Sequence, residues 1–310
     1  MVEEKWEKSI EKLSASAAIL SLTEIGLGSM LHAFKVPFSG HFLSLNQALI
    51  LGKTQLAIKD SNYAKFCPSQ VSLISSLLKS LSPVGKKLTP MLAISVQGLL
   101  FNIGTLIFGI NPLGVWLGTI LLCLWSFIQP IGIYVFLFGK NLAFMAEYFL
   151  NKFSMLKNID LDYIWTVVLI LIGIKITLGT IVTVLIFTLE KEKYHQWQKT
   201  LIKNAQSKKA NLSQQFMPQD FKHSVKHAFK DLLNPLFVST WIFSLVFFLF
   251  VDSEHSQFIW AICRPIIIGF LLFLSIRLMP MDQLFSLLNK WGFNNFSKIL
   301  QSSIDKLKKL

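Results

Sequence analysis

The amino-acid sequence predicts an all-α, polytopic helical membrane protein. Of its 310 residues, 53% are hydrophobic and only 15% are charged, and the mean hydropathy is +0.53. This composition excludes a disordered chain and is unlike that of an ordinary soluble domain. Several apolar runs have the length that a helix needs to cross a bilayer core, about 20 residues, and they lie at 115–139, 164–189, 235–251 and 258–279.

About eight membrane helices follow from the apolar segments and the breaks between them. They cover residues 13–34, 42–58, 68–82, 90–110, 113–139, 164–189, 233–251 and 258–279. The second and third helices are short and polar, so we expect neighbouring helices to shelter them from lipid. Two amphipathic segments, 140–156 and 281–310, are expected to lie along the membrane surface or against a partner.

The predicted helices fall into three parts of the chain. Residues 1–190 form a six-helix bundle, residues 191–231 a basic linker without an apolar run, and residues 232–310 a two-helix extension with an amphipathic tail. Lysines in the linker and tail predict that both termini lie inside, because positive residues favour the cytoplasmic side. Lys86 and Lys87 are the exception, since this topology places them outside.

The net charge of +13 is concentrated beside the predicted spans. In a membrane protein this distribution indicates orientation and contact with anionic lipids, at the linker and the tail. We therefore expect no nucleic-acid partner. The charged N-terminus, without a short apolar core and a small-residue cleavage site, predicts that no signal peptide is removed.

Motifs of nucleotide-dependent and metal-dependent enzymes do not occur in the sequence. It contains no GxxxxGK[ST] loop and no HExxH, GxSxG or CxxC. His223 and His227 have a spacing that can seat two metal ligands, but no third ligand accompanies them, so a solvated basic face is favoured. Cys67, Cys123 and Cys263 are interpreted as buried small hydrophobes. We therefore predict no catalytic residue, no metal and no cofactor.

Two ionisable residues lie within predicted spans, where an unpaired charge is costly to bury. Glu24, in the first helix, is either a ligand-site residue or a structural carboxyl that is protonated or paired, for instance with Lys175. Lys175 lies near the centre of the sixth helix, far from both ends. It either pairs with a carboxylate or meets an anionic ligand group in an aqueous cavity.

Amide side chains at membrane depth form a second group of candidate ligand residues. Gln97 and Asn102 lie in the fourth helix, and Gln129 lies beside a proline in the fifth. Such amides either join helices or line a polar ligand site. We expect some of them to surround one pocket with His41, from the loop before the second helix, and with Asn46 and Gln47 of that helix.

Small residues recur four apart on the first helix. The pairs are Ser14 with Ala18 and Ala17 with Ser21. This spacing lets another helix approach closely, and that helix belongs either to this chain or to a second subunit.

Four stretches of the first 190 residues form a family-like pattern: the small-residue first helix, FKVPFSGHFLSLNQALILG, a short helix ending in LLKSLSP, and PMLAISVQGLLFNIGTLIFGINPLGVWLG. The pattern resembles the substrate-binding S component of energy-coupling-factor (ECF) vitamin transporters. The resemblance implies a protein of the bacterial cytoplasmic membrane that captures a vitamin or similar micronutrient beneath the loop Lys35–His41. It also implies docking, through Ser14, Ala17, Ala18 and Ser21, on a transmembrane coupling subunit that works with ATP-binding subunits. The linker and the last two helices have no counterpart in that family.

Two other functional classes stay open. An intramembrane enzyme acting on a lipid-linked substrate would use His32, His41 or Glu24 as acid or base, and it requires two of these groups within hydrogen-bond reach. A structural or assembly membrane protein would use the basic linker and tail to bind anionic lipid or a partner.

Overall fold

The computed structural model describes residues 2–33, 39–80, 88–138, 161–206, 221–233 and 281–309, with scattered positions between 238 and 275. Every regular element in these ranges is a helix, as the sequence predicts. The predicted helices 233–251 and 258–279 and the segment 140–156 lie wholly or largely outside the described residues.

Two compact units make up the chain. The first comprises Met1–Ser126, Ile174–Pro218 and Pro280–Leu310, and the second comprises Phe127–Gly173 and Gln219–Met279. The boundaries at residues 190 and 231 stay a prediction of the sequence.

The first unit begins with α1 (Val2–Ala33), α2 (Ser39–Ala57), the short 3-10 helix η1 (Ala64–Phe66), α3 (Cys67–Ser80) and α4 (Leu88–Phe108). Two helices run through both units, and these are α5 (Pro112–Phe138) and α8 (Leu161–Thr188). The first unit also contains α9 (Lys191–Gln206), α13 (Met281–Lys290) and α14 (Asn294–Lys309). These bounds lie close to the predicted ones except at the start of α1. That helix begins at Val2 because the lysines and glutamates before residue 13 are good helix formers, although they are too polar for a span.

Three helices in the described part of the chain are long and apolar enough to cross a membrane, through Thr89–Phe108, Pro112–Gln129 and Val168–Thr188. They expose large apolar side chains, the surface that a spanning helix offers to lipid; examples are Leu99, Ile103, Leu106, Leu178, Ile181 and Leu185. The structure therefore supports a helical membrane protein. The full set of eight membrane helices and their orientation stay predictions of the sequence.

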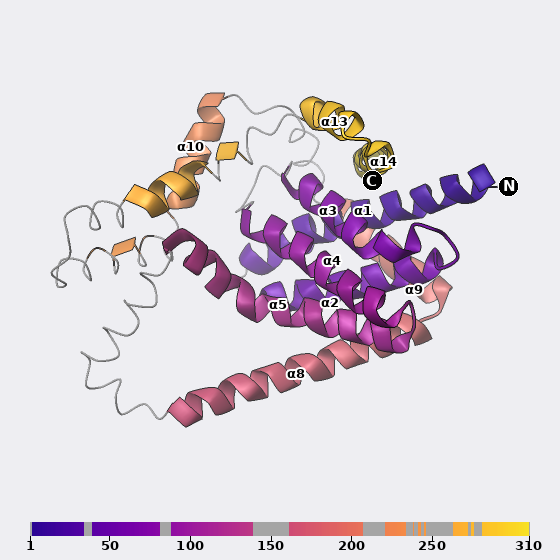
Figure 1. The fold of residues 1–310 in the computed structure, drawn as a ribbon, viewed down its shortest axis with the longest axis horizontal. Coiled ribbons are helices and arrows are strands. Elements are labelled where there is room, and N and C mark those ends of the chain that lie inside the picture. Colours follow the sequence, from indigo (N-terminus) through magenta and orange to yellow (C-terminus); the bar gives the residue numbers. More distant parts are fainter. Residues whose placement is uncertain are drawn as a thin grey trace. The chain divides into compact units, whose positions relative to one another are not determined.

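α2 and α3 pack inside the first unit. α2 contacts α1, α3 and α4, while α3 contacts α1, α4 and α14, and Figure 1 shows these helices grouped together. Their polar side chains are thereby buried against protein, as the shelter argument requires.

A tight turn joins α4 to α5. Gly109 has a φ of +83°, a left-handed conformation that glycine adopts without strain after a helix. Asn111 caps α5, since its Oδ1 accepts a hydrogen bond from the Gly114 backbone N–H at 2.9 Å. Beyond the turn the two helices touch at Gly104 and Gly118, where a Cβ added to Gly104 would overlap the Gly118 backbone.

The N-terminal half of α1 meets α14 and the loop between α2 and η1. Trp6 Nε1 donates a hydrogen bond to the Tyr63 hydroxyl, and Asn295 Nδ2 donates to the same oxygen at 3.1 Å. The Lys298 ammonium lies 5.0 Å from the centre of the Trp6 ring. The first turns of α1 and the start of α14 therefore lie side by side.

The second unit contains α10 (Phe221–Leu232) and a helical stretch at 263–271. Ser224 and Ala228 of α10 are fully buried. Phe229 packs on Phe270, with ring centres 4.7 Å apart. Ser224 and Ala228 thus mark the buried face of α10 in the described part of this unit.

Gly104→Ala is expected to destabilise the protein by about 1–3 kcal/mol, because the added methyl group forces α4 and α5 apart. Gly132→Ala, on α5, is the matched control, since nothing lies within 4 Å of a Cβ at that position. Equilibrium unfolding in mixed detergent micelles measures both. Equal unfolding free energies for the two variants would contradict the close crossing.

Candidate functional site

Lys175 is held inside the first unit by neutral groups. Its ammonium donates hydrogen bonds to the His41 carbonyl at 2.8 Å and to the Ser44 hydroxyl at 2.9 Å. The residue is only 3% exposed, and none of the ion pairs found among the described residues includes it. An ammonium has three donors, so one N–H is left without a partner in the described part of the chain.

Glycines bring α8 close to α5 and α2 around this lysine. A Cβ added to Gly179 would lie 2.9 Å from the Ile120 side chain, and one added to Gly52 would lie 2.5 Å from Ile186. Such small residues let helix backbones approach in a membrane. The short distance between helices is what allows Lys175 to reach the first turn of α2.

His41 and Ser126 extend this arrangement. Ser126 Oγ lies 2.9 Å from His41 Nδ1 and donates a hydrogen bond to the Cys123 carbonyl at 2.7 Å. A hydroxyl has one hydrogen, so with that hydrogen on the carbonyl, His41 Nδ1 is the donor in the pair. We call His41, Ser44, Cys123, Ser126 and Lys175 the Lys175 cluster.

The structure thus brings together two of the residues that the sequence singled out, His41 and Lys175. Ser44 and Ser126 were missed, although a signal for Ser44 exists. It follows His41 by three residues and therefore lies on the same helical face. No comparable signal identifies Ser126, because its proximity to His41 depends on how α5 packs against α2.

Gln47 joins three helices of the first unit. Its Nε2 donates hydrogen bonds to Ser72 Oγ at 3.1 Å and to the Ile94 carbonyl at 2.9 Å. Its Oε1 has no partner in the described part of the chain although the side chain is fully buried. Gln47 therefore joins helices, and it also keeps one buried acceptor uncommitted.

Three more of the predicted amides lie in the first unit with Gln47. Asn46 Nδ2 donates to Thr23 Oγ1 at 3.2 Å, while Gln97 and Asn102 are buried on α4, and Asn102 Oδ1 lacks a partner among the described residues. Gln55 was missed, yet its Nε2 donates to Thr105 Oγ1 at 3.1 Å. It follows Gln47 by eight residues, a helical repeat that places both amides on one face.

Lys79 is the charged neighbour of Glu24. Lys79 Nζ donates a hydrogen bond to the Glu24 backbone carbonyl at 2.9 Å. The Lys79 charge also attracts the Glu24 carboxyl, although none of the ion pairs found among the described residues joins the two side chains. The two residues are 7% and 5% exposed. The suggested pairing of Glu24 with Lys175 is therefore wrong. α1 packs on α3 near Glu24, whereas Lys175 of α8 forms its hydrogen bonds with α2.

The small-residue face of α1 is covered from within the chain. Ser14, Ala17, Ala18 and Ser21 are fully buried. Ser302 Oγ of α14 donates to Ser14 Oγ at 3.1 Å, and Lys306 Nζ donates to the Glu11 carbonyl at 2.8 Å. Packing within the chain accounts for these contacts, and docking of a second subunit here stays a prediction.

The remaining predicted positions are not members of the Lys175 cluster. Gln129 is a buried residue of the second unit, and the side chains of His32, His223 and His227 lie outside the described residues. No group of three His, Cys, Asp or Glu that could hold a metal occurs in the described ranges. Comparison with protein-family models, curated proteins and solved structures finds no match to this chain.

Lys79→Met is expected to cost about 1–3 kcal/mol of unfolding free energy, because it leaves the buried Glu24 carbonyl without its charge-assisted hydrogen bond and removes a cation that acts on the Glu24 carboxyl. Adding Glu24→Gln should recover part of the loss, since a neutral amide needs no counter-charge. A double-mutant cycle in mixed micelles measures this coupling. Strictly additive effects would contradict the pairing of the two residues.

Proposed function

We propose that the chain is the substrate-binding component of a membrane uptake transporter for a small molecule that carries an anionic group. The observation that supports this proposal is the burial of the Lys175 ammonium without an anionic partner among the described residues. This ammonium is buried in a candidate membrane span and contacts only neutral acceptors among the described residues. A ligand carboxylate or phosphate would supply the missing counter-charge.

The energetic argument rests on burial. An ion removed from water costs several kcal/mol unless a counter-ion and hydrogen bonds replace the lost hydration. Two hydrogen bonds to neutral groups replace only part of the lost hydration of the ammonium. An anion beside Lys175 would add an attractive charge and accept its third hydrogen bond. Ionisable residues inside membrane spans commonly mark substrate or ion pathways for the same reason.

The neighbouring side chains would provide the orientation that a small ligand needs. Ser44 and Ser126 donate to the His41 and Cys123 carbonyls in this structure, so each would accept from a ligand, or donate to it after the hydroxyl rotates. The His41 ring adds a third polar group. The uncommitted acceptor on Gln47, further along α2, would suit a donor at the other end of the ligand. A few polar groups among apolar walls are typical of small-molecule sites.

The S-component resemblance names the fuller form of this proposal. In that form the ligand is a vitamin or related micronutrient, the protein lies in a bacterial cytoplasmic membrane, and ECF transmembrane and ATP-binding subunits drive uptake. Docking through Ser14, Ala17, Ala18 and Ser21 would then require α14 to leave Ser14. Anionic lipids would bind the basic linker and tail.

The contact between Ser126 and His41 favours a second candidate function, an intramembrane serine hydrolase. A serine hydroxyl beside an imidazole is the minimal nucleophile and base arrangement. Labelling of Ser126 by a fluorophosphonate probe, absent in Ser126→Ala, would support this enzyme. We expect no labelling, because the Ser126 hydrogen is directed to the Cys123 carbonyl rather than to His41.

Lys175→Met is expected to abolish ligand-induced thermal stabilisation of the purified protein. The wild type would be screened against biotin, pantothenate, nicotinate and pyridoxal phosphate as anions, with thiamine as the cationic comparison. A bound ligand at 100 times its dissociation constant stabilises the folded state by about 2.7 kcal/mol.

Lys53→Met is the control for that experiment, because Lys53 bonds to the Leu189 carbonyl at the other end of α2. It should keep the ligand response. Stabilisation by thiamine alone, or an anion response that survives Lys175→Met, would contradict the proposal.

A further inference from the structure

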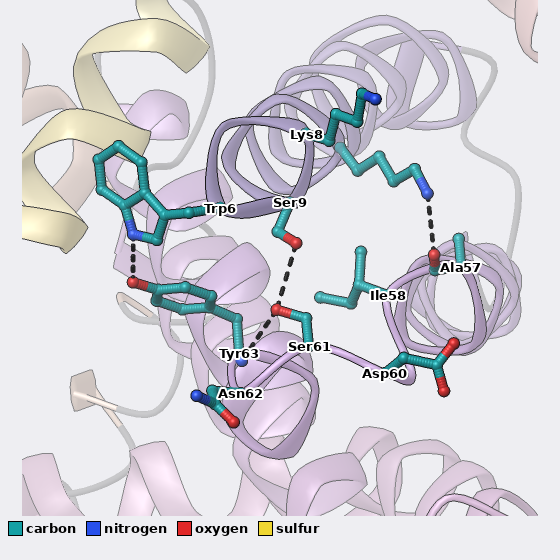
Figure 2. A pocket seen from close by; sticks show the side chains of 10 residues that line it. Trp6, Lys8, Ser9, Ala57, Ile58, Asp60, Ser61, Asn62 and Tyr63 are labelled. Carbon is teal, nitrogen blue, oxygen red and sulfur yellow. Dashed lines mark hydrogen bonds between the residues drawn. The ribbon is translucent and has the colours of Figure 1, made fainter. Parts of the chain in front are cut away.

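A hollow with several polar side chains in its walls lies at the end of the first unit where α1 begins. It has a volume of about 380 Å³ and is formed between the first turns of α1 and the loop that follows α2. Figure 2 shows Trp6 and Tyr63 along one side and Asp60 on the opposite side. None of the predicted ligand residues lines it, so it is separate from the Lys175 cluster.

Hydrogen bonds across the hollow hold its walls together. Trp6 bonds to the Tyr63 hydroxyl, Ser9 Oγ donates to Ser61 Oγ at 3.2 Å, and Lys12 Nζ donates to the Ala57 carbonyl at 2.9 Å. Trp6, Ser9 and Lys12 recur every three residues, which places them along one face of α1. The hollow is therefore preformed, and binding there needs little reorganisation.

The lining is suited to an anion with several oxygen atoms. Its ionisable residues are Lys8, Lys12 and Asp60, which carry one net positive charge. Hydroxyl and amide side chains of Ser61, Asn62 and Tyr63 add further polar groups to the lining. Lysine is a common partner of phosphate because its ammonium acts as a point charge with three donors.

We propose that this hollow binds a phosphate group, as a monoester or a diester, between Lys8 and Lys12. The phosphate belongs either to the headgroup of an acidic glycerophospholipid or to a soluble phosphorylated metabolite. The lipid source fits the position of the hollow, since tryptophan, tyrosine and lysine are typical of the membrane interface. The predicted topology places this end of α1 on the cytoplasmic side, where anionic lipids concentrate.

Three probes distinguish the sources, added to the full chain purified in a neutral detergent. Dioctanoyl phosphatidylglycerol carries both phosphate and acyl chains, sn-glycerol 3-phosphate carries only the phosphate, and dioctanoylglycerol carries only the chains. Native mass spectrometry measures the stoichiometry and the dissociation constant for each. We expect one tight phosphatidylglycerol site and much weaker binding of dioctanoylglycerol.

The double variant Lys8→Gln, Lys12→Gln is expected to weaken phosphatidylglycerol binding about 30-fold, since a lysine near an anionic lipid surface contributes about 1 kcal/mol. The matched control is Lys59→Gln, Lys65→Gln. It removes the same charge from two exposed lysines of the adjacent segment that do not line the hollow, and it should leave the dissociation constant within a few-fold. Lys8→Gln alone keeps the Lys12 bond to Ala57 and covers the case in which the double variant fails to fold.

Two results support the proposal and two overturn it. Selective loss of phosphatidylglycerol binding in the Lys8 variants supports a lipid site, and equally tight, Lys8-dependent binding of sn-glycerol 3-phosphate supports a site for a soluble phosphate. Equal losses in the two double variants would reduce the effect to diffuse charge and overturn the site. Binding of dioctanoylglycerol as tight as that of phosphatidylglycerol would also overturn it. The outcome is independent of Lys175, so the transporter proposal is not tested by this experiment.

Discussion

The polar face of α1 has to be covered by protein, and the first unit is organised around that requirement. Hydroxyl, amide and charged groups away from water cost free energy unless they find partners. α1 receives such partners from α2, α3, α14 and the loop after α2. The bonds join Ser9 to Ser61, Ser14 to Ser302, Ser16 to Thr54, Thr23 to Asn46 and the Glu24 carbonyl to Lys79. The contact between the first and last helices of the chain follows from the same need.

The apolar helices α4, α5 and α8 have the complementary task of facing lipid. Their glycines permit close approach to each other and to α2, as at Gly104 and Gly179. Lys175 departs from this pattern, because it is the one charged residue in the span Val168–Thr188. Its hydrogen bonds tie the most lipid-exposed of these helices to the start of α2. An ionisable group inside a candidate span either makes a costly structural hydrogen bond or belongs to a binding site. The neutral partners of Lys175 favour a binding site.

Much of the first unit could be predicted from the sequence. Apolar runs and their breaks gave helix bounds close to the observed ones, and Gly109, Asn111 and Pro112 mark a turn by their conformational preferences alone. The start of α1 could not be predicted, because residues that form good helices in water are excluded by a search for apolar spans. Lys79 was overlooked because a lysine near the end of a short predicted helix is usually one that snorkels, with its ammonium at the membrane interface.

Only part of the membership of the candidate site could be predicted from the sequence. His41, Gln47 and Lys175 are recognisable as polar residues in an apolar setting, which is a local property of the sequence. The contacts depend on which helix faces meet. Because of that packing, Lys175 bonds to His41 and Ser44, and Glu24 lies beside Lys79 rather than beside Lys175.

The sequence by itself determined that this chain is helical, that it suits a membrane, and which side chains need partners there. Hydropathy and helical periodicity decide these matters within each segment, without reference to the rest of the chain. Only the tertiary structure decided which residues are the hydrogen-bond partners of these side chains. Residues as distant as Ser14 and Ser302 meet because glycine and small side chains set how closely helices approach, and that packing is a property of surfaces from many segments at once.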